Sequence, residues 1–173
     1  MKALAVVLGR MPPDFPLPIV VVQHIDPHHV SQVASILARR TCLPVKEAAQ
    51  HDALAAGHVY VAPPDFHAEF LEGAILLTRT PPVHFARPSA DRSFLSGAEQ
   101  GRVIGVVLSG AGIDGAAGVV AIKRAGGVVI AQDSATAEHF GMPQAAIETG
   151  AVEYVLPLDE IGPALTTLAR TVE

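Results

Sequence analysis

Short apolar runs and helical patterns alternate along most of the chain. β-branched residues are frequent in four of the runs, IVVV at 19–22, HVYVA at 58–62, VIGVVL at 103–108 and VVIA at 128–131. Such runs are typical of strands buried on both faces of a sheet. Apolar residues at helical spacing, with capping and stop signals, predict the intervening helices. These helices are expected at 1–11, 30–40, 88–100, 116–124 and 158–171, with shorter helical segments at 135–139 and 144–148.

The remaining extended segments include one antiparallel pair. Residues 66–71 and 74–80 flank Glu72-Gly73, and an X-Gly pair between two strand-like runs predicts a β-hairpin. Further extended pieces are expected at 44–48 and 152–155. Because strands that alternate with helices form parallel sheets, the chain is predicted to be an α/β protein. It would have a doubly wound, mostly parallel sheet with helices on both faces and one antiparallel β-hairpin, within one domain of 173 residues.

Composition narrows the classes of partner. The formal net charge is −5 and no cluster of Lys or Arg occurs, which argues against nucleic-acid binding and against a basic helix on a membrane surface. No apolar stretch reaches the roughly 18–20 residues that span a bilayer, so no membrane insertion is expected. Cys42 is the single cysteine and cannot form an internal disulfide, which fits a cytoplasmic location and a structural role for this thiol.

Two ionisable residues follow predicted strands directly. His24 comes after IVVV, and Asp114 lies in the glycine-rich turn after VIGVVL. The carboxyl ends of parallel strands are where α/β proteins bind and react, so a hydrogen bond between this imidazole and this carboxylate is expected. The carboxylate would orient the ring and leave the second ring nitrogen as a base. Two simpler interpretations stay open: a core histidine bonded to a backbone carbonyl, and an N-cap for the helix that starts at Gly115.

The turn SGAGIDG at 109–115 exposes backbone N–H groups ahead of a helix, where they could hold a phosphate or an oxyanion. It lacks the GK[ST] ending of a P-loop. Its glycines match the GxGxxG spacing, but Asp133 is a poor candidate for the ribose-binding acid, so dinucleotide binding is disfavoured. Asp26, His28 and His29 could suggest a metal site. No partner residue has ligand spacing, and no metal is expected.

Five longer motifs occur in a fixed order along nearly the whole chain. They are PIVVVQHIDP at 18–27, GHVYVAPPDFH at 57–67, RPSADRSF at 87–94, GVVLSGAGIDGAAG at 105–118 and AQDSATAEHFGMPQAAIETGAVEYVLPLDEI at 131–161. Together they resemble the catalytic domain of the chemotaxis receptor protein-glutamate methylesterases. The resemblance implies a Ser-His-Asp hydrolase of methyl esters on receptor glutamates, with glutamine deamidation as a second candidate reaction, and no metal or cofactor. The expected partners are methyl-accepting chemotaxis receptors.

The resemblance also assigns roles to residues. His24 and Asp114 match the catalytic histidine and aspartate of the family. The family's turn is typically TGMGNDG, whereas this chain has SGAGIDG, and the backbone N–H groups of Ala111 and Gly112 are the candidates for holding an oxyanion. Arg87 is expected in a groove for an acidic receptor helix. Met142, in the GMP at 141–143, is expected in a loop that lines the same cleft.

The nucleophilic serine of the family is not found in this sequence. It lies in a turn similar to GASAGG after the first strand, and residues 1–11 read as the helix that follows that turn. The favoured expectation is therefore that residues 1–173 form a methylesterase-like catalytic domain truncated at its N-terminus, without a receiver domain and inactive until the upstream serine is supplied. An uncovered strand edge would favour self-association of this form.

Two alternatives to an upstream serine stay open. The chain could be a genuinely inactive relative, or another serine could have taken over, with Ser109 the nearest to the proposed site in sequence. The main alternative function is a catalytically inactive module that binds the receptor or regulates it. A third is nucleotide binding by the turn at 109–115.

Overall fold

The computed structural model describes residues 1–24 and 30–171. Within these residues the helices are α1 (Lys2–Leu8), α2 (Val33–Ala38), α3 (Ala90–Gln100), α4 (Ala116–Arg124), α5 (Gly141–Glu148) and α6 (Leu158–Thr171). The strands are β1 (Ile19–Val21), β2 (Val45–Glu47), β3 (Val59–Val61), β4 (His67–Leu71), β5 (Ala74–Thr78), β6 (Ile104–Val107), β7 (Val128–Gln132) and β8 (Tyr154–Leu156).

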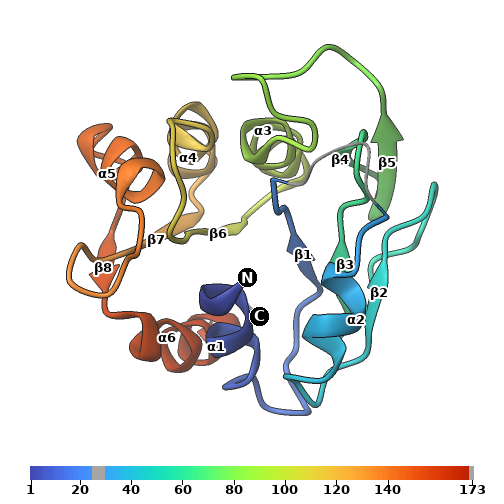
Figure 1. The fold of residues 1–173 in the computed structure, drawn as a ribbon, viewed down its shortest axis with the longest axis horizontal. Coiled ribbons are helices and arrows are strands. Elements are labelled where there is room, and N and C mark those ends of the chain that lie inside the picture. The colour runs from blue at the N-terminus through green and yellow to red at the C-terminus, as the bar shows by residue number, and fades with distance from the viewer. Residues whose placement is uncertain (25–29, 172–173) are drawn as a thin grey trace.

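The parallel strands form two sheets of three strands each, in the orders β1-β3-β2 and β6-β7-β8. Their register pairs Ile19 with Val59 in the first sheet and Ile104 with Val128 in the second. β1 and β6 are both edge strands, and Figure 1 shows them as neighbours with no strand between them. The predicted α/β class with mostly parallel strands is confirmed, but the single predicted sheet is divided at this position.

Helices cover both faces of the β6-β7-β8 sheet. Figure 1 shows α3, α4 and α5 above this sheet and α1 and α6 below it. The lower layer is held by an apolar core in which Val7 and Leu8 of α1 are buried with Ile130 of β7 and Ile161 of α6. A second core joins α4 to the upper face through Val119 and Ile122, which are fully buried. Burial of apolar surface stabilises a fold by roughly 25 cal/mol per Å². The two cores therefore hold the sheet and its helices together.

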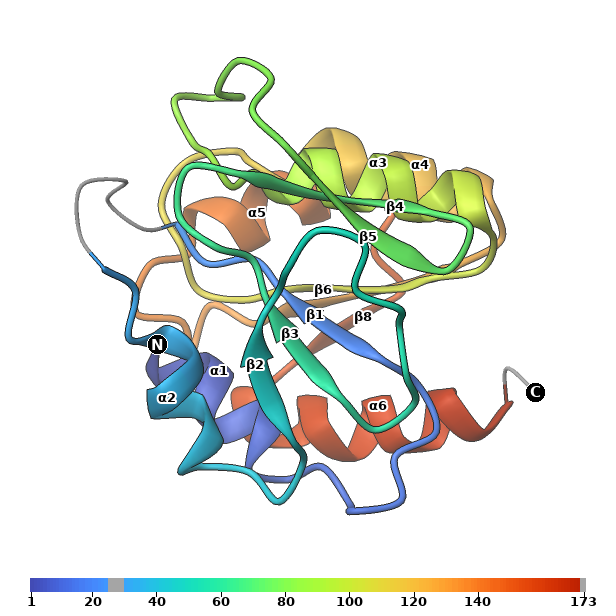
Figure 2. The ribbon, with the colours of Figure 1, turned by 90° about the vertical axis from the view of Figure 1, so that its right-hand side faces the viewer.

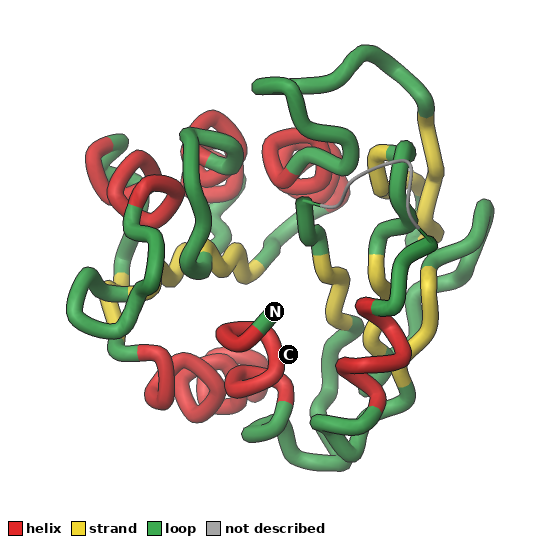
Figure 3. Tube along the Cα trace, viewed as in Figure 1, coloured by secondary structure: helices red, strands yellow, loops and turns green. Residues whose placement is uncertain are grey.

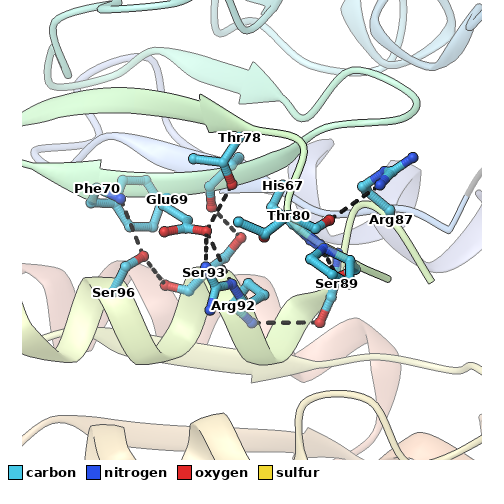
Figure 4. A network of polar contacts seen from close by, with 12 residues as sticks. His67, Glu69, Phe70, Thr78, Thr80, Arg87, Ser89, Arg92, Ser93 and Ser96 are labelled. Carbon is cyan, nitrogen blue, oxygen red and sulfur yellow. Dashed lines mark hydrogen bonds and ion pairs between the residues drawn. The ribbon is translucent and has the colours of Figure 1, made fainter. Parts of the chain in front are cut away.

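The predicted β-hairpin is confirmed. β4 and β5 are antiparallel, and Glu72 and Gly73 between them both have positive φ, at 49° and 76°, as a two-residue hairpin turn requires. Figure 2 shows the hairpin lying against α3. Polar contacts join them in Figure 4: Arg92 of α3 bonds Glu69 of β4 at 2.6 Å, and Ser96 Oγ accepts the Phe70 N–H at 3.1 Å. The hairpin thereby helps to hold α3, the helix that the functional site uses.

Several predicted helix bounds differ from those of the structure, and two of the differences have a clear physical reason. The helix predicted from residue 30 begins only at Val33, because Val30 is 94% exposed and its side chain adds nothing to the apolar face. The helical segment predicted at 135–139 is a turn instead. Asp133 Oδ1 accepts hydrogen bonds from the Thr136 N–H at 2.9 Å and the Thr136 hydroxyl at 2.6 Å, and such a local side-chain bond competes with helix formation.

Candidate active site

His24 and Asp114 meet across the gap between the two sheets. His24 lies three residues beyond the end of β1, and Asp114 lies in the turn between β6 and α4. Nε2 of His24 is 2.7 Å from Oδ2 of Asp114. The His24 side chain is 35% exposed whereas the Asp114 side chain is 2% exposed, so the carboxylate lies beneath the ring and the ring faces outward. The structure thus brings together the two residues that the strand-end argument selects.

Asp114 is held by the N-terminus of α3. Its Oδ1 accepts hydrogen bonds from the Ser89 hydroxyl at 2.7 Å and the Asp91 N–H at 3.0 Å, and its Oδ2 accepts from the Ala90 N–H at 2.7 Å. The N-cap position of α4 is Gly115, with no side-chain cap. The interpretation of Asp114 as a cap for the helix that follows it in sequence is therefore wrong. The carboxylate accepts from the first-turn N–H groups of a helix that precedes it in the chain.

These contacts set the ionisation of the carboxyl group. Burial raises the pKa of Asp114, but hydrogen bonds from His24, Ser89 and the backbone N–H groups of Asp91 and Ala90 outweigh it and bring the pKa from 3.8 to about 2. Asp114 is thus an anion at neutral pH, and Nε2 of His24 must be the donor in their hydrogen bond. Nδ1 of His24 has no hydrogen-bond partner among the described residues.

The pair opens onto a pocket of about 640 Å³. The wall consists of residues from the 82–87 loop and the 111–114 turn, together with His24 and Asp65. Figure 3 shows the long loop between β5 and α3 that contains residues 82–87. Pockets that bind small molecules or reactive side chains have volumes of roughly 300–1,000 Å³, so this one can receive a side chain and its neighbours.

The turn at 109–115 supplies backbone donors to this pocket. Ala111 and Gly112 line the pocket, and their N–H groups have no acceptor among the residues that the structure describes. Two backbone hydrogen bonds hold the turn in place. The Gly110 N–H donates to the His139 carbonyl at 2.9 Å, and the Gly110 carbonyl accepts from the Met142 N–H at 2.8 Å. Met142 therefore lies behind the turn and is not among the residues that form the pocket wall. A Cβ at Gly110 would be 2.6 Å from Met142 Sδ, so any larger residue here would require the Met142 side chain to move.

Arg87 lines the pocket but its guanidinium is already occupied. Nε bonds Asp65 Oδ1 at 3.0 Å, Nη2 forms an ion pair with the same oxygen, and Nη1 bonds the Thr80 carbonyl at 3.1 Å. The last of these bonds is visible in Figure 4. A guanidinium that is paired with a carboxylate attracts an acidic polypeptide less than an unpaired guanidinium does. In this arrangement Arg87 therefore holds the loop in place more than it attracts an acidic partner.

Sequence reasoning missed two features of the site. The pattern around Ser89 indicates only a helix start, yet this serine is fully buried and its hydroxyl donates to Asp114. The signal is present in the RPSAD segment, which places a capping serine ahead of α3. The second feature is another imidazole–carboxylate pair: His84 Nε2 is 3.3 Å from Oδ2 of the buried Asp91. Burial raises the pKa of Asp91, and the Asp114 charge adds to this, while the Gly118 N–H and His84 oppose it.

Some expectations concern other parts of the chain. Asp26, His28 and His29, considered as a metal site, lie outside the described residues. Elsewhere in residues 1–24 and 30–171, no three His, Cys, Asp or Glu side chains are grouped so as to hold a metal ion.

Over the same ranges, the helices are too short or too polar to cross a membrane. Ser109 is not among the residues that line the pocket, and its Oγ accepts the His139 N–H at 2.9 Å.

A buried, ionised aspartate that orients an imidazole at the carboxyl edge of parallel strands is the arrangement of α/β hydrolases that use a Ser-His-Asp triad. Comparison with known proteins gives a more specific result. The family model of the CheB methylesterase matches residues 1–165. The crystal structure of the CheB methylesterase catalytic domain of Thermotoga maritima superimposes with a TM-score of 0.91, at 37% identity, and the match covers 96% of this chain and 92% of that one. The chain belongs to the CheB methylesterase family.

Curated relatives are similarly close in sequence. A protein-glutamate methylesterase/protein-glutamine glutaminase of Anaeromyxobacter dehalogenans is 49% identical over 98% of this chain and 50% of its own length. One from Pyrococcus horikoshii is 42% identical over 92% of this chain and 45% of its own length. The chain thus spans about half the length of the curated relatives it matches.

Proposed function

We propose that this domain hydrolyses γ-methyl esters of glutamate side chains on methyl-accepting chemotaxis receptors, with His24 and Asp114 as members of a Ser-His-Asp triad. The observation that carries the proposal is the 2.7 Å contact between His24 Nε2 and an Asp114 carboxylate whose pKa is about 2. Such an anion fixes the ring tautomer and stabilises the imidazolium that forms when Nδ1 takes a proton. In this proposal residues 1–173 act as one catalytic domain in the cytoplasm, where the free Cys42 stays reduced.

The proposed reaction has two stages. A serine hydroxyl attacks the ester carbonyl while His24 Nδ1 takes its proton, and the N–H groups of Ala111 and Gly112 bind the oxyanion. The tetrahedral intermediate collapses, His24 returns the proton to the departing methoxide, and methanol leaves. Water then attacks the acyl-enzyme with His24 as base, which releases the glutamate carboxylate and restores the serine. The same steps with ammonia as leaving group would deamidate glutamine.

The serine is proposed to come from a segment outside this sequence. The support is topological: β1 leads to His24, β6 leads to Asp114, and within the described part of the chain each of these strands is paired on one side only. A parallel strand between them would deliver the turn at its carboxyl end beside both residues. The same open edges favour pairing with another chain. We therefore also propose that the 173-residue chain associates with itself, and light scattering that finds a stable monomer at all concentrations would contradict this.

The central experiment replaces His24 with Gln in a form of the protein that includes the serine-bearing segment. Methanol release from a methylated receptor should fall by about 10²–10⁴-fold, because the base is lost while the fold is kept. His58→Gln is the matched control, since this imidazole is partly exposed and bonds the nearby Ala56 carbonyl at 3.0 Å. An unchanged rate in the His24 variant would rule out the proposal. Binding of the receptor without any release of methanol by the unaltered protein would instead favour an inactive receptor-binding module.

A further inference from the structure

The loop that forms one wall of the pocket ends in a strained turn. Val83 and Ala86 exchange both backbone hydrogen bonds, at 3.0 and 2.9 Å, and the two residues between them have positive φ, 49° at His84 and 64° at Phe85. Turns of this kind ordinarily contain Asn-Gly, because other residues in the left-handed region cost about 1–2 kcal/mol each. Three of the five described non-glycine residues with positive φ, namely Asp65, His84 and Phe85, line this one pocket. Strain concentrated in this way is typical of functional sites.

The turn is anchored at one residue and exposed at the next. His84 Nε2 is 3.3 Å from Oδ2 of Asp91, a buried carboxylate whose Oδ1 also accepts the Gly118 N–H at 2.7 Å. This contact ties the turn to α3 and α4. Phe85 is 103% exposed, which is the highest value among the described large apolar residues. An aromatic ring in water at the wall of a pocket, on a backbone that is strained and held in place, contributes nothing to the folded core.

The charges of the pocket indicate what kind of group it receives. Each cationic or titratable nitrogen side chain of the wall is paired with a carboxylate: His24 with Asp114, His84 with Asp91 and Arg87 with Asp65. The exposed parts that remain are apolar, chiefly the Phe85 ring and Ile113, which is 54% exposed. This surface suits an uncharged ester and apolar neighbours better than a free carboxylate. The volume of about 640 Å³ also exceeds that of one esterified side chain.

We propose that Phe85 is a specificity-determining residue that packs against an apolar side chain next to the methylated glutamate, so that the site selects esters carried on a polypeptide over small esters. The inference rests on the proposed ester hydrolysis, whose substrate it makes more specific. Ile113, on the 111–114 turn, offers the second apolar contact. Aromatic residues are the side chains that most often dominate such contacts, because they bury a large area with few rotatable bonds.

The first test uses binding and needs no turnover. The chain contains no Trp, so Phe85→Trp places a single indole at the pocket wall. A synthetic peptide with one glutamate γ-methyl ester flanked by leucines should shift its emission to shorter wavelength and protect it from acrylamide, whereas N-acetylglutamate γ-methyl ester should not. Tyr154→Trp is the control, since Tyr154 is aromatic, 46% exposed and not part of the pocket wall. Unchanged emission of the Phe85→Trp variant at saturating peptide would overturn the inference.

The second test separates binding from structure. Phe85→Gly removes the ring and also relieves the strain, so the variant should have a higher Tm than the unaltered protein while its KM for the methylated peptide rises about tenfold. In the serine-bearing form, kcat/KM should fall much further for the peptide than for the small ester. Equal losses on both substrates would overturn the inference. If no form releases methanol but the indole of the Phe85→Trp variant still responds to the peptide, the proposed hydrolysis fails and the contact stands.

Discussion

The hydroxyl of Ser89 donates a 2.7 Å hydrogen bond to Oδ1 of Asp114, although the two residues are 25 positions apart and belong to different βα units. Ser89 is also the N-cap of α3, where its Oγ accepts the Arg92 N–H at 3.5 Å. One buried hydroxyl thus begins a helix and orients the acid of the proposed triad. The stability of the domain and the geometry of the site are linked through this side chain.

Replacing Ser89 with Ala should reveal this link. The variant loses the cap and one of the donors to Asp114, so its free energy of unfolding should fall by about 1–2 kcal/mol. Urea denaturation monitored by circular dichroism measures the change. Ser134→Ala is a suitable reference, because Ser134 is exposed and makes no side-chain hydrogen bond to a described residue. If both variants unfold at the same urea concentration, the hydrogen bonds of Ser89 contribute nothing to the free energy of unfolding.

The acid dependence of stability should depend on Asp114. Its folded pKa of about 2 lies below the unfolded value of 3.8, so the stabilisation is complete above about pH 4 and is lost as the pH falls through about 2. Asp114→Asn cannot ionise, and it should lose about 2 kcal/mol at neutral pH and approach the unaltered protein near pH 2. Thermal unfolding across this range measures the difference.

Glu99→Gln controls for the loss of one negative charge, since Glu99 is an exposed residue of α3 with no ion pair to a described residue. Its stability curve should follow that of the unaltered protein at every pH. A constant gap between the Asp114 variant and the unaltered protein from about pH 2 to about pH 7 would show that the ionisation of Asp114 is not the source of the effect.

Two glycine-to-alanine substitutions in neighbouring helices should act in opposite directions. A Cβ at Gly118 of α4 would lie 2.4 Å from Phe94 Cβ, so Gly118→Ala must push α3 and α4 apart and should cost about 1–3 kcal/mol. A Cβ at Gly97 of α3 would have no neighbour closer than 3.4 Å, so Gly97→Ala should gain about 0.5–1 kcal/mol from the higher helix propensity of alanine. The urea concentration at the midpoint of unfolding, measured for both variants, tests this prediction. Midpoints that shift in the same direction in both variants would contradict the packing argument.

Much of the fold and the central pair could be predicted from the sequence, because both follow from local patterns. β-branched runs locate β1, β3, β6 and β7, and the predicted bounds of α4 and α6 agree with those of the structure. His24 and Asp114 stand out because each follows such a run, and parallel strands deliver their carboxyl ends to one edge. The structure places them in hydrogen-bond contact, while their catalytic roles stay a prediction.

The features that could not be predicted depend on contacts distant in sequence or on backbone conformation. No periodicity shows that the first turn of α3 would meet Asp114, since the Ser89 contact spans 25 residues. The turn at His84 and Phe85 is equally hidden, because Phe rarely adopts positive φ and His is only a weak signal for it. The division of the sheet between β1 and β6 is a matter of strand order, which local patterns do not encode.

The attachment of Asp114 to α3 has a consequence for how this domain becomes competent. Apart from the hydrogen bond from His24, the contacts that lower the pKa of Asp114 come from the N-terminus of α3, through the Ser89 hydroxyl and the N–H groups of Ala90 and Asp91. Separation of α3 from the turn that carries Asp114 would remove these three donors, so the pKa of Asp114 would rise and His24 would be its one remaining described partner. Local opening of this one helix would therefore change the acidity and the orientation of the carboxyl group in the proposed site while the rest of the domain stayed folded.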